Sequence, residues 1–71
     1  MDVLVFKTSV QEPKQVNKVQ TLLTKIPTIQ NWNFDLEDCD NILRIVSNGL
    51  SPRQIETVLQ KAGIGCEELA Y

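Results

Sequence analysis

Hydrophobic and polar positions alternate along one segment in the middle of the chain. Trp32, Phe34 and Leu36 are apolar, and the residues around them are Asn, Asp or Glu. Successive side chains of a strand point to opposite faces, so this period of two predicts a strand with one buried and one solvated face. Turn-forming residues at 38–41 follow, and the apolar run 42–46 predicts the return strand of a hairpin.

The first third of the chain changes from a strand-like run to a helical period. The run Val3 to Phe6 predicts a short strand. Apolar residues then recur at spacings of three and four, which place them on one helical face. These positions are Val16, Val19, Leu23 and Ile26. Pro13 suits the first position of this helix and Pro27 ends it. Ser9 and Glu12 also fit a capping box, so a start about three residues earlier stays open.

A second helix has clearer start and stop signals. Ser51 is a suitable N-cap, Pro52 a suitable first residue, and Gln54 completes a capping box. The apolar positions that follow are Ile55, Val58, Leu59 and Ala62. Gly63 is suited to the left-handed conformation just past a helix, and residues 66–71 are long enough for a final edge strand.

The predicted order over residues 1–71 is strand, helix, strand, strand, helix, strand, in a single domain. Two such halves build an α+β, ferredoxin-like βαββαβ sandwich. Its antiparallel sheet has four strands in the order 4-1-3-2, and right-handed crossovers place both helices on one face. The loop after the first strand, the hairpin turn and the loop before the last strand then share one end of the sheet, here called the rim. The rim is expected to hold Ser9, Glu12, Cys39 and Cys66.

Composition and charge exclude several classes of function. The chain has 71 residues, no histidine, and a formal net charge of −2. Without histidine, Ser-His or Cys-His catalysis within one chain is impossible, and so short a chain offers little room for a deep cleft. We therefore expect no enzyme and no cofactor. A sequence pI near 4.9 disfavours nucleic acid, whose phosphates must be neutralised by Lys and Arg.

The sequence also indicates a cytoplasmic protein that does not enter a membrane. No apolar stretch approaches the roughly 20 residues needed to span a bilayer, and the start lacks a basic region followed by an apolar one. The two cysteines are then expected to stay reduced. They are far apart in the sequence, so they form no CxxC motif.

The order and spacing of several segments resemble the heavy-metal-associated domain of copper chaperones and metal-pumping ATPases. These segments are Val16-Asn17-Lys18-Val19, Leu22-Leu23, Ile26-Pro27, the strand 32–37, Leu50-Ser51-Pro52 with Ile55 and Val58, and Lys61-Ala62-Gly63. The resemblance implies the ferredoxin-like fold and a role in metal transport. In that family two thiolates on the loop after the first strand bind soft Cu(I). Counted back from Val16, the equivalent positions here are Ser9 and Glu12, and residues 1–38 contain no cysteine. The family's metal site is therefore absent.

The other possible metal ligands at the rim are two cysteines and several carboxylates, each of which also has a simpler structural interpretation. Cys39 and Cys66 lie beside opposite edge strands, about 14 Å apart, which disfavours a shared metal site or a disulfide. Cys66, after a flexible Gly-Ile-Gly segment, is expected to be a small apolar packing residue, and Cys39 an exposed turn residue. Carboxylates that could gather at the rim are Glu12, Glu37, Asp38, Asp40, Glu67 and Glu68. Solvated acidic turns are the simpler interpretation. A Cu or Zn site that Cys66, Glu12, Cys39 or these carboxylates share with a second chain remains the alternative.

Three lysines mark the first helix. Lys14, Lys18 and Lys25 fall on the face opposite its apolar positions, counted at 100° per residue. A solvated surface is the simpler interpretation. The functional one, which the resemblance implies, is docking to a protein partner with an acidic face. We expect a monomer or a weak homodimer.

Overall fold

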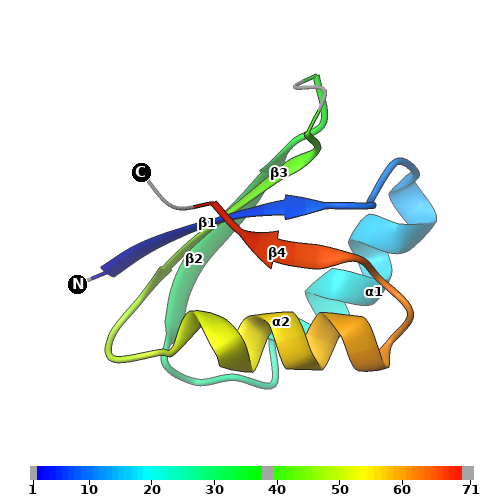
Figure 1. Cartoon of the computed structure of the whole chain (residues 1–71). Helices are drawn as coiled ribbons and strands as arrows, with labels where there is room; N and C mark the ends of the chain where they lie inside the picture. The colour runs from blue at the N-terminus through cyan, green and yellow to red at the C-terminus, as the bar shows by residue number, and fades with distance from the viewer. Residues whose placement is uncertain (1, 38–39, 70–71) are drawn as a thin grey trace.

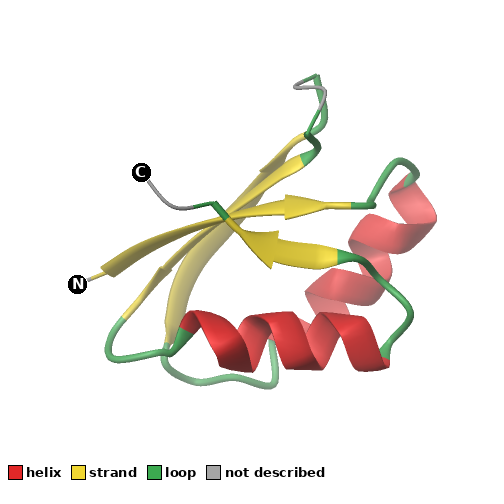
Figure 2. Ribbon diagram, in the orientation of Figure 1, coloured by secondary structure: helices red, strands yellow, loops and turns green. Residues whose placement is uncertain are grey.

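The computed structural model describes residues 2–37 and 40–69 and contains a four-stranded antiparallel sheet with two helices on one face (Figures 1 and 2). The elements are β1 (Asp2–Thr8), α1 (Pro13–Leu23), β2 (Ile29–Asp35), β3 (Ile42–Ser47), α2 (Pro52–Lys61) and β4 (Cys66–Glu68). The strands lie in the order β2-β3-β1-β4, which is the predicted order 4-1-3-2 seen from the other side. The ferredoxin-like prediction is therefore confirmed.

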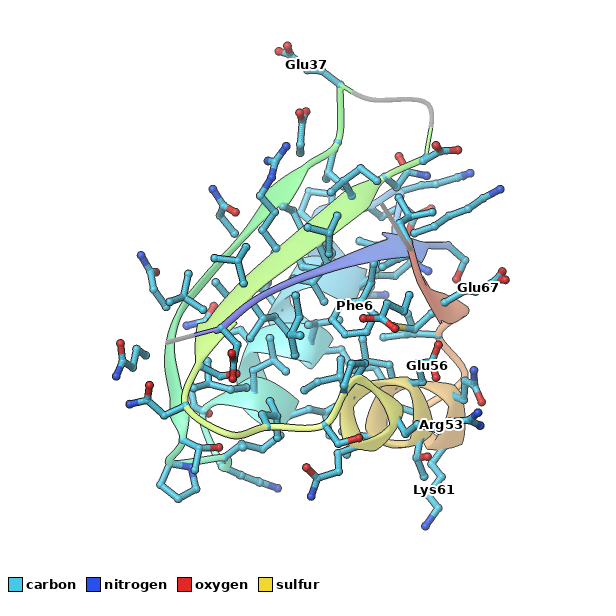
Figure 3. The ribbon with its side chains drawn as sticks, turned by 60° about the vertical axis from the view of Figure 1, so that its left-hand side comes forward. Phe6, Glu37, Arg53, Glu56, Lys61 and Glu67 are labelled. Atoms are coloured by element: carbon cyan, nitrogen blue, oxygen red, sulfur yellow. The ribbon has the colours of Figure 1, made fainter. Side chains whose placement is uncertain are left out.

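The core lies between the two central strands and the helices. Phe6 of β1 and both Leu43 and Ile45 of β3 are fully buried, and Phe6 lies between the sheet and α2 in Figure 3. The helices contribute Val19, Leu23, Ile55 and Leu59. Full burial of one such aliphatic or aromatic side chain stabilises the fold by about 1.5–3 kcal/mol. Apolar packing thus fixes the ends of β1 and β3 on which the rim is built.

Helix α1 begins at the later of the two predicted positions. Glu12 is its N-cap and Pro13 its first residue. The Gln15 side chain turns back, and its Oε1 accepts hydrogen bonds from the backbone N–H groups of Gln11 (2.8 Å) and Glu12 (3.2 Å). Ser9 caps no helix, because its hydroxyl bonds a different loop.

The end of α1 differs from the prediction. The helix stops at Leu23, before Pro27 is reached. The backbone N–H groups of Lys25 and Ile26 then donate to the carbonyls of Leu22 (3.3 Å) and Leu23 (3.0 Å), so the last turn tightens to i to i+3 spacing and the α-helical pattern ends. Ile26 still packs against the core, but neither it nor Lys25 belongs to the helix.

Strand β2 confirms the period of two and corrects its end. Trp32 lies opposite Ile45 and Phe34 opposite Leu43, so both aromatic side chains face the core. Their rings contact edge to face, with centroids 5.8 Å apart and planes at 84°. Leu36 lies beyond the strand and is 38% exposed, so its predicted burial is wrong.

Helix α2 begins as the sequence predicts. Ser51 Oγ accepts from the Arg53 N–H (3.3 Å), and Gln54 Oε1 accepts from the Ser51 N–H (3.1 Å). Gly63 has a φ of +82°, the left-handed value expected of it. Strand β4 is shorter than the predicted 66–71 and ends at Glu68.

Candidate functional site

Two loops far apart in the sequence are joined at the rim by reciprocal hydrogen bonds. The Ser9 N–H donates to the Gly65 carbonyl (3.0 Å), and the Gly65 N–H donates to Ser9 Oγ (2.8 Å). A Cβ on Gly65 would lie 3.2 Å from Ser9 Oγ, so the approach leaves no comfortable room for a side chain. Ile64 is buried as well. The segment before Cys66 is therefore held in place, which corrects the expectation that it is flexible.

The β2–β3 hairpin joins the same end of the sheet through Thr8. The Thr8 N–H donates to the Asp40 carbonyl (3.2 Å), and its hydroxyl donates to the Asn41 carbonyl (2.6 Å). The same hydroxyl oxygen accepts from the Val10 N–H (3.2 Å). The structure thus brings Ser9, Cys66 and the hairpin to one rim, as predicted. Cys39 lies outside the described residues.

Glu12 serves the backbone at the start of α1. It is exposed, its carbonyl accepts from the Val16 N–H (3.2 Å) as the first bond of the helix, and its own N–H is bound by Gln15. An open depression beside it is lined by Ser9, Gln11, Glu12, Lys14, Gln15 and Lys18. The resemblance equates Ser9 and Glu12 with the metal-binding thiolates. In this structure Ser9 instead bonds Gly65 of another loop, and Glu12 is the N-cap of α1.

Cys66 is a core residue. Only 5% of it is exposed, and it packs in the main apolar cluster. Burial, with a smaller contribution from the negative charge of Glu56, raises the pKa of the Cys66 thiol to about 12. The thiolate is the form that binds metals, so Cys66 is a poor ligand at neutral pH in this conformation. Its interpretation as a packing residue is confirmed.

The acidic side chains are spread over the surface. Asp40 Oδ1 lies 3.8 Å from Lys7 Nζ in an exposed ion pair. Glu37 extends from the end of the hairpin, far from Glu67 and Glu56 in Figure 3. Among residues 2–37 and 40–69, no three Cys, Asp or Glu side chains come together in a group that could hold a metal ion. The described carboxylates therefore form no metal-binding group at the rim, which agrees with the simpler interpretation of solvated acidic turns, and Asp38 lies outside the described residues.

The lysines do not form one stripe. The Lys18 ammonium donates to the Ala62 carbonyl (2.6 Å) at the C-terminal end of α2, where unpaired carbonyls favour a cation. Lys14 is exposed on α1, and Lys25 lies past the end of the helix. Since Lys18 and Ala62 are 44 positions apart, the local pattern carried no signal of this contact.

Two side chains of α2 close the outer edge of β4. Gln60 Nε2 donates to the Cys66 carbonyl (3.0 Å), and Glu56 Oε2 accepts from the Glu68 N–H (2.9 Å). Glu56 lies on the side of α2 toward β4 in Figure 3. Sequence reasoning did not find these two residues, because both fit a plain polar helix surface.

Comparison with solved structures shows where the same fold occurs. The solution structure of the yeast copper transporter domain Ccc2a, in apo and Cu(I)-loaded states, superposes with a TM-score of 0.81 at 16% identity, covering 96% of this chain and 94% of that one. The N-terminal domain of ZntA in its Zn(II) form gives 0.74 at 18% identity, covering 93% and 89%. The chain therefore shares the fold of these two domains.

Sequence comparison adds no closer relationship. No protein-family model matches the chain, and no curated protein matches it. Among the described residues, no helix is long and apolar enough to cross a membrane.

Proposed function

We propose that this chain is a non-enzymatic protein-interaction module with the fold of metal-transport domains and without a thiolate metal site. The observation that carries the proposal is the use made of Ser9 and Glu12. Ser9 fastens the β1–α1 loop to Gly65, and Glu12 caps α1. In the resembling family this loop binds a soft metal, whereas in this chain its residues bond other parts of the fold.

The proposed docking surface is the exposed side of α1 that carries Lys14 and Lys18, with Lys25 beyond its end. The Lys18 ammonium is held by the Ala62 carbonyl, so it presents a fixed cation one turn from Lys14. A partner with an acidic face fits this surface. Such charges speed and orient association more than they strengthen it.

An acidic peptide tests the docking surface directly. Decaglutamate added to the isotopically labelled chain should shift the amide signals around Lys14 and Lys18, and 0.3 M salt should remove the effect. Lys14→Glu should weaken binding about fivefold. Arg53→Glu, at the exposed start of α2, is the matched control, with the same change in net charge. Equal weakening by both variants, or shifts spread evenly over the surface, would contradict a docking site on α1.

A shared metal site is the second candidate. Cys66 lines a depression at the rim together with Lys7, Thr8, Ser9, Gly65 and Glu67, so a ligand from a second chain could reach its surroundings. Titration with Cu(I) and with Zn(II), followed by mass spectrometry, separates the candidates. If the chain is an interaction module without a metal site, it should bind neither Cu(I) nor Zn(II) stoichiometrically. Sub-micromolar binding that is lost in Cys66→Ser would instead establish the shared site.

A further inference from the structure

The two edges of the sheet differ in how their backbone groups are used. At β4 the outward Cys66 carbonyl and Glu68 N–H are bound by α2. At β2, the opposite edge, the Trp32 N–H faces away from β3 and donates to the side chain of its own neighbour Asn31 (2.8 Å), a bond within the strand that pairing with another strand would replace. Peptide groups alternate in direction along an antiparallel strand, so those of Phe34 face outward too.

The residues of β2 do little to discourage pairing. Edge strands are commonly protected by lysine, proline, shortness or bulges. β2 spans seven residues against three in β4, and it contains no lysine or proline. The register with β3 shifts between Ile29 and Asn31, which leaves residues 31–35 regularly paired. Its one charged residue is Asp35, at the end.

We propose that β2 pairs antiparallel with β2 of a second copy of this chain, which joins the two sheets into one continuous sheet across a twofold axis. The inference does not depend on the docking surface on α1. It rests on the open edge and on the pattern of side chains along it.

The outward peptide groups restrict the register, because they must lie opposite outward groups of the other copy. The pairing we propose places Trp32 of one copy opposite Phe34 of the other, so that both residues exchange hydrogen bonds across the twofold axis. Asn33 then faces Asn33, and Asn31 faces Asp35. Aromatic pairs are favourable cross-strand neighbours, and the Asn31 amide can donate a hydrogen bond to the Asp35 carboxylate that faces it. The two Asp35 carboxylates never face each other, so the strand complements itself.

Trp32 and Phe34 also supply apolar surface for the contact. Both are only partly buried at this edge, although their rings lie on the core side of the sheet. A second strand beside them extends the aromatic layer across the interface and covers part of the surface that they still expose. The edge backbone and the partly exposed aromatic side chains therefore favour the same partner.

Asn33→Glu is the sharpest variant. Within one copy Asn33 lies opposite Arg44, so a new carboxylate there gains a favourable neighbour and leaves the fold intact. Across the twofold axis it faces its own copy. Sedimentation equilibrium up to about 1 mM should show a dimer for the unmodified chain, and about fivefold weaker association for Asn33→Glu.

Two controls separate register from overall charge. Gln30→Glu adds the same charge to the same strand but does not face itself, so association should change by less than about twofold. An equimolar mixture of Asn33→Glu and Asn33→Lys should restore the dimer, because opposite charges then meet at the axis. Concentration-dependent protection of the Trp32 and Phe34 amides from hydrogen exchange, with the Glu68 amide unaffected, locates the interface.

Several results would overturn the inference. These are a chain that stays monomeric at about 1 mM, equal weakening by Asn33→Glu and Gln30→Glu, or a mixture that fails to associate. Binding of an unrelated extended peptide along β2 by a monomeric chain would assign the edge to a different partner.

Discussion

The two ends of the sheet differ in whether their buried hydroxyl groups form hydrogen bonds. Thr8, at the rim, bonds the Asn41 carbonyl and the Val10 N–H with one hydroxyl. Ser47, at the far end of β3, is fully buried, and its hydroxyl has no hydrogen-bond partner among the described residues. The Thr8 hydroxyl thus joins three segments at the rim, whereas the Ser47 hydroxyl joins nothing among the described residues. A buried hydroxyl stabilises the fold only where the surroundings provide partners.

The largest effect is expected at Thr8. Thr8→Val keeps the side-chain shape and leaves the buried Val10 N–H and the Asn41 carbonyl without their partner. Urea unfolding should show a loss of about 2 kcal/mol. Thr57→Val, at an exposed position of α2, is the control and should change stability by less than about 0.5 kcal/mol. A loss at Thr8 no larger than that of the control would show that the rim does not depend on this hydroxyl.

The second effect is a dependence on pH at Cys66, also at the rim. The folded-state pKa of this thiol, about 12, lies above the ordinary value of a free cysteine. As pH rises above 9.0, the ordinary value, the unfolded chain loses the proton and the folded chain keeps it, so stability at pH 10 should be about 1.4 kcal/mol lower than at pH 7. Well below pH 9.0 the contribution is fully present.

Other groups also titrate at alkaline pH, so the informative quantity is the difference from Cys66→Ala. Urea unfolding at pH 7, 8.5 and 10 should give a steeper loss for the unmodified chain than for the variant. Parallel curves would mean that the thiol ionises as easily in the folded state as in the unfolded one.

The smallest effect, of opposite sign, is expected at the far end. Ser47→Ala removes a buried hydroxyl without a partner, so stability should stay level or rise by up to about 1 kcal/mol. Ser51→Ala is the matched comparison, since its hydroxyl caps α2 and its removal should cost about 1 kcal/mol. A similar loss from both changes would show that the Ser47 hydroxyl has a partner after all.

What the sequence could predict follows from the range of each interaction. The start and end of α2 depend on Ser51, Gln54 and Gly63, whose effects reach only a few residues, and all three were predicted correctly. The end of α1 was missed because the last turn tightened before Pro27 was reached. The position of Leu36 was missed because β2 ends at Asp35.

The sequence predicted where the candidate site lies but not the contacts between its residues. Topology alone brings the loops near Ser9 and Cys66 to one rim, so their proximity could be deduced. The bond between Ser9 and Gly65 joins residues 56 positions apart and depends on glycine permitting a close approach. Neither that bond nor the Lys18–Ala62 contact leaves a periodic or local signal in the sequence.

The contacts between α2 and β4 have a consequence for the order of folding. Gln60 and Cys66 are six residues apart, and Glu56 and Glu68 are 12 apart, so closing these loops costs little chain entropy. The pairing of β1 with β4 joins the two ends of the chain and costs more. We therefore expect the C-terminal helix and strand to form a local unit before β1 docks between β3 and β4.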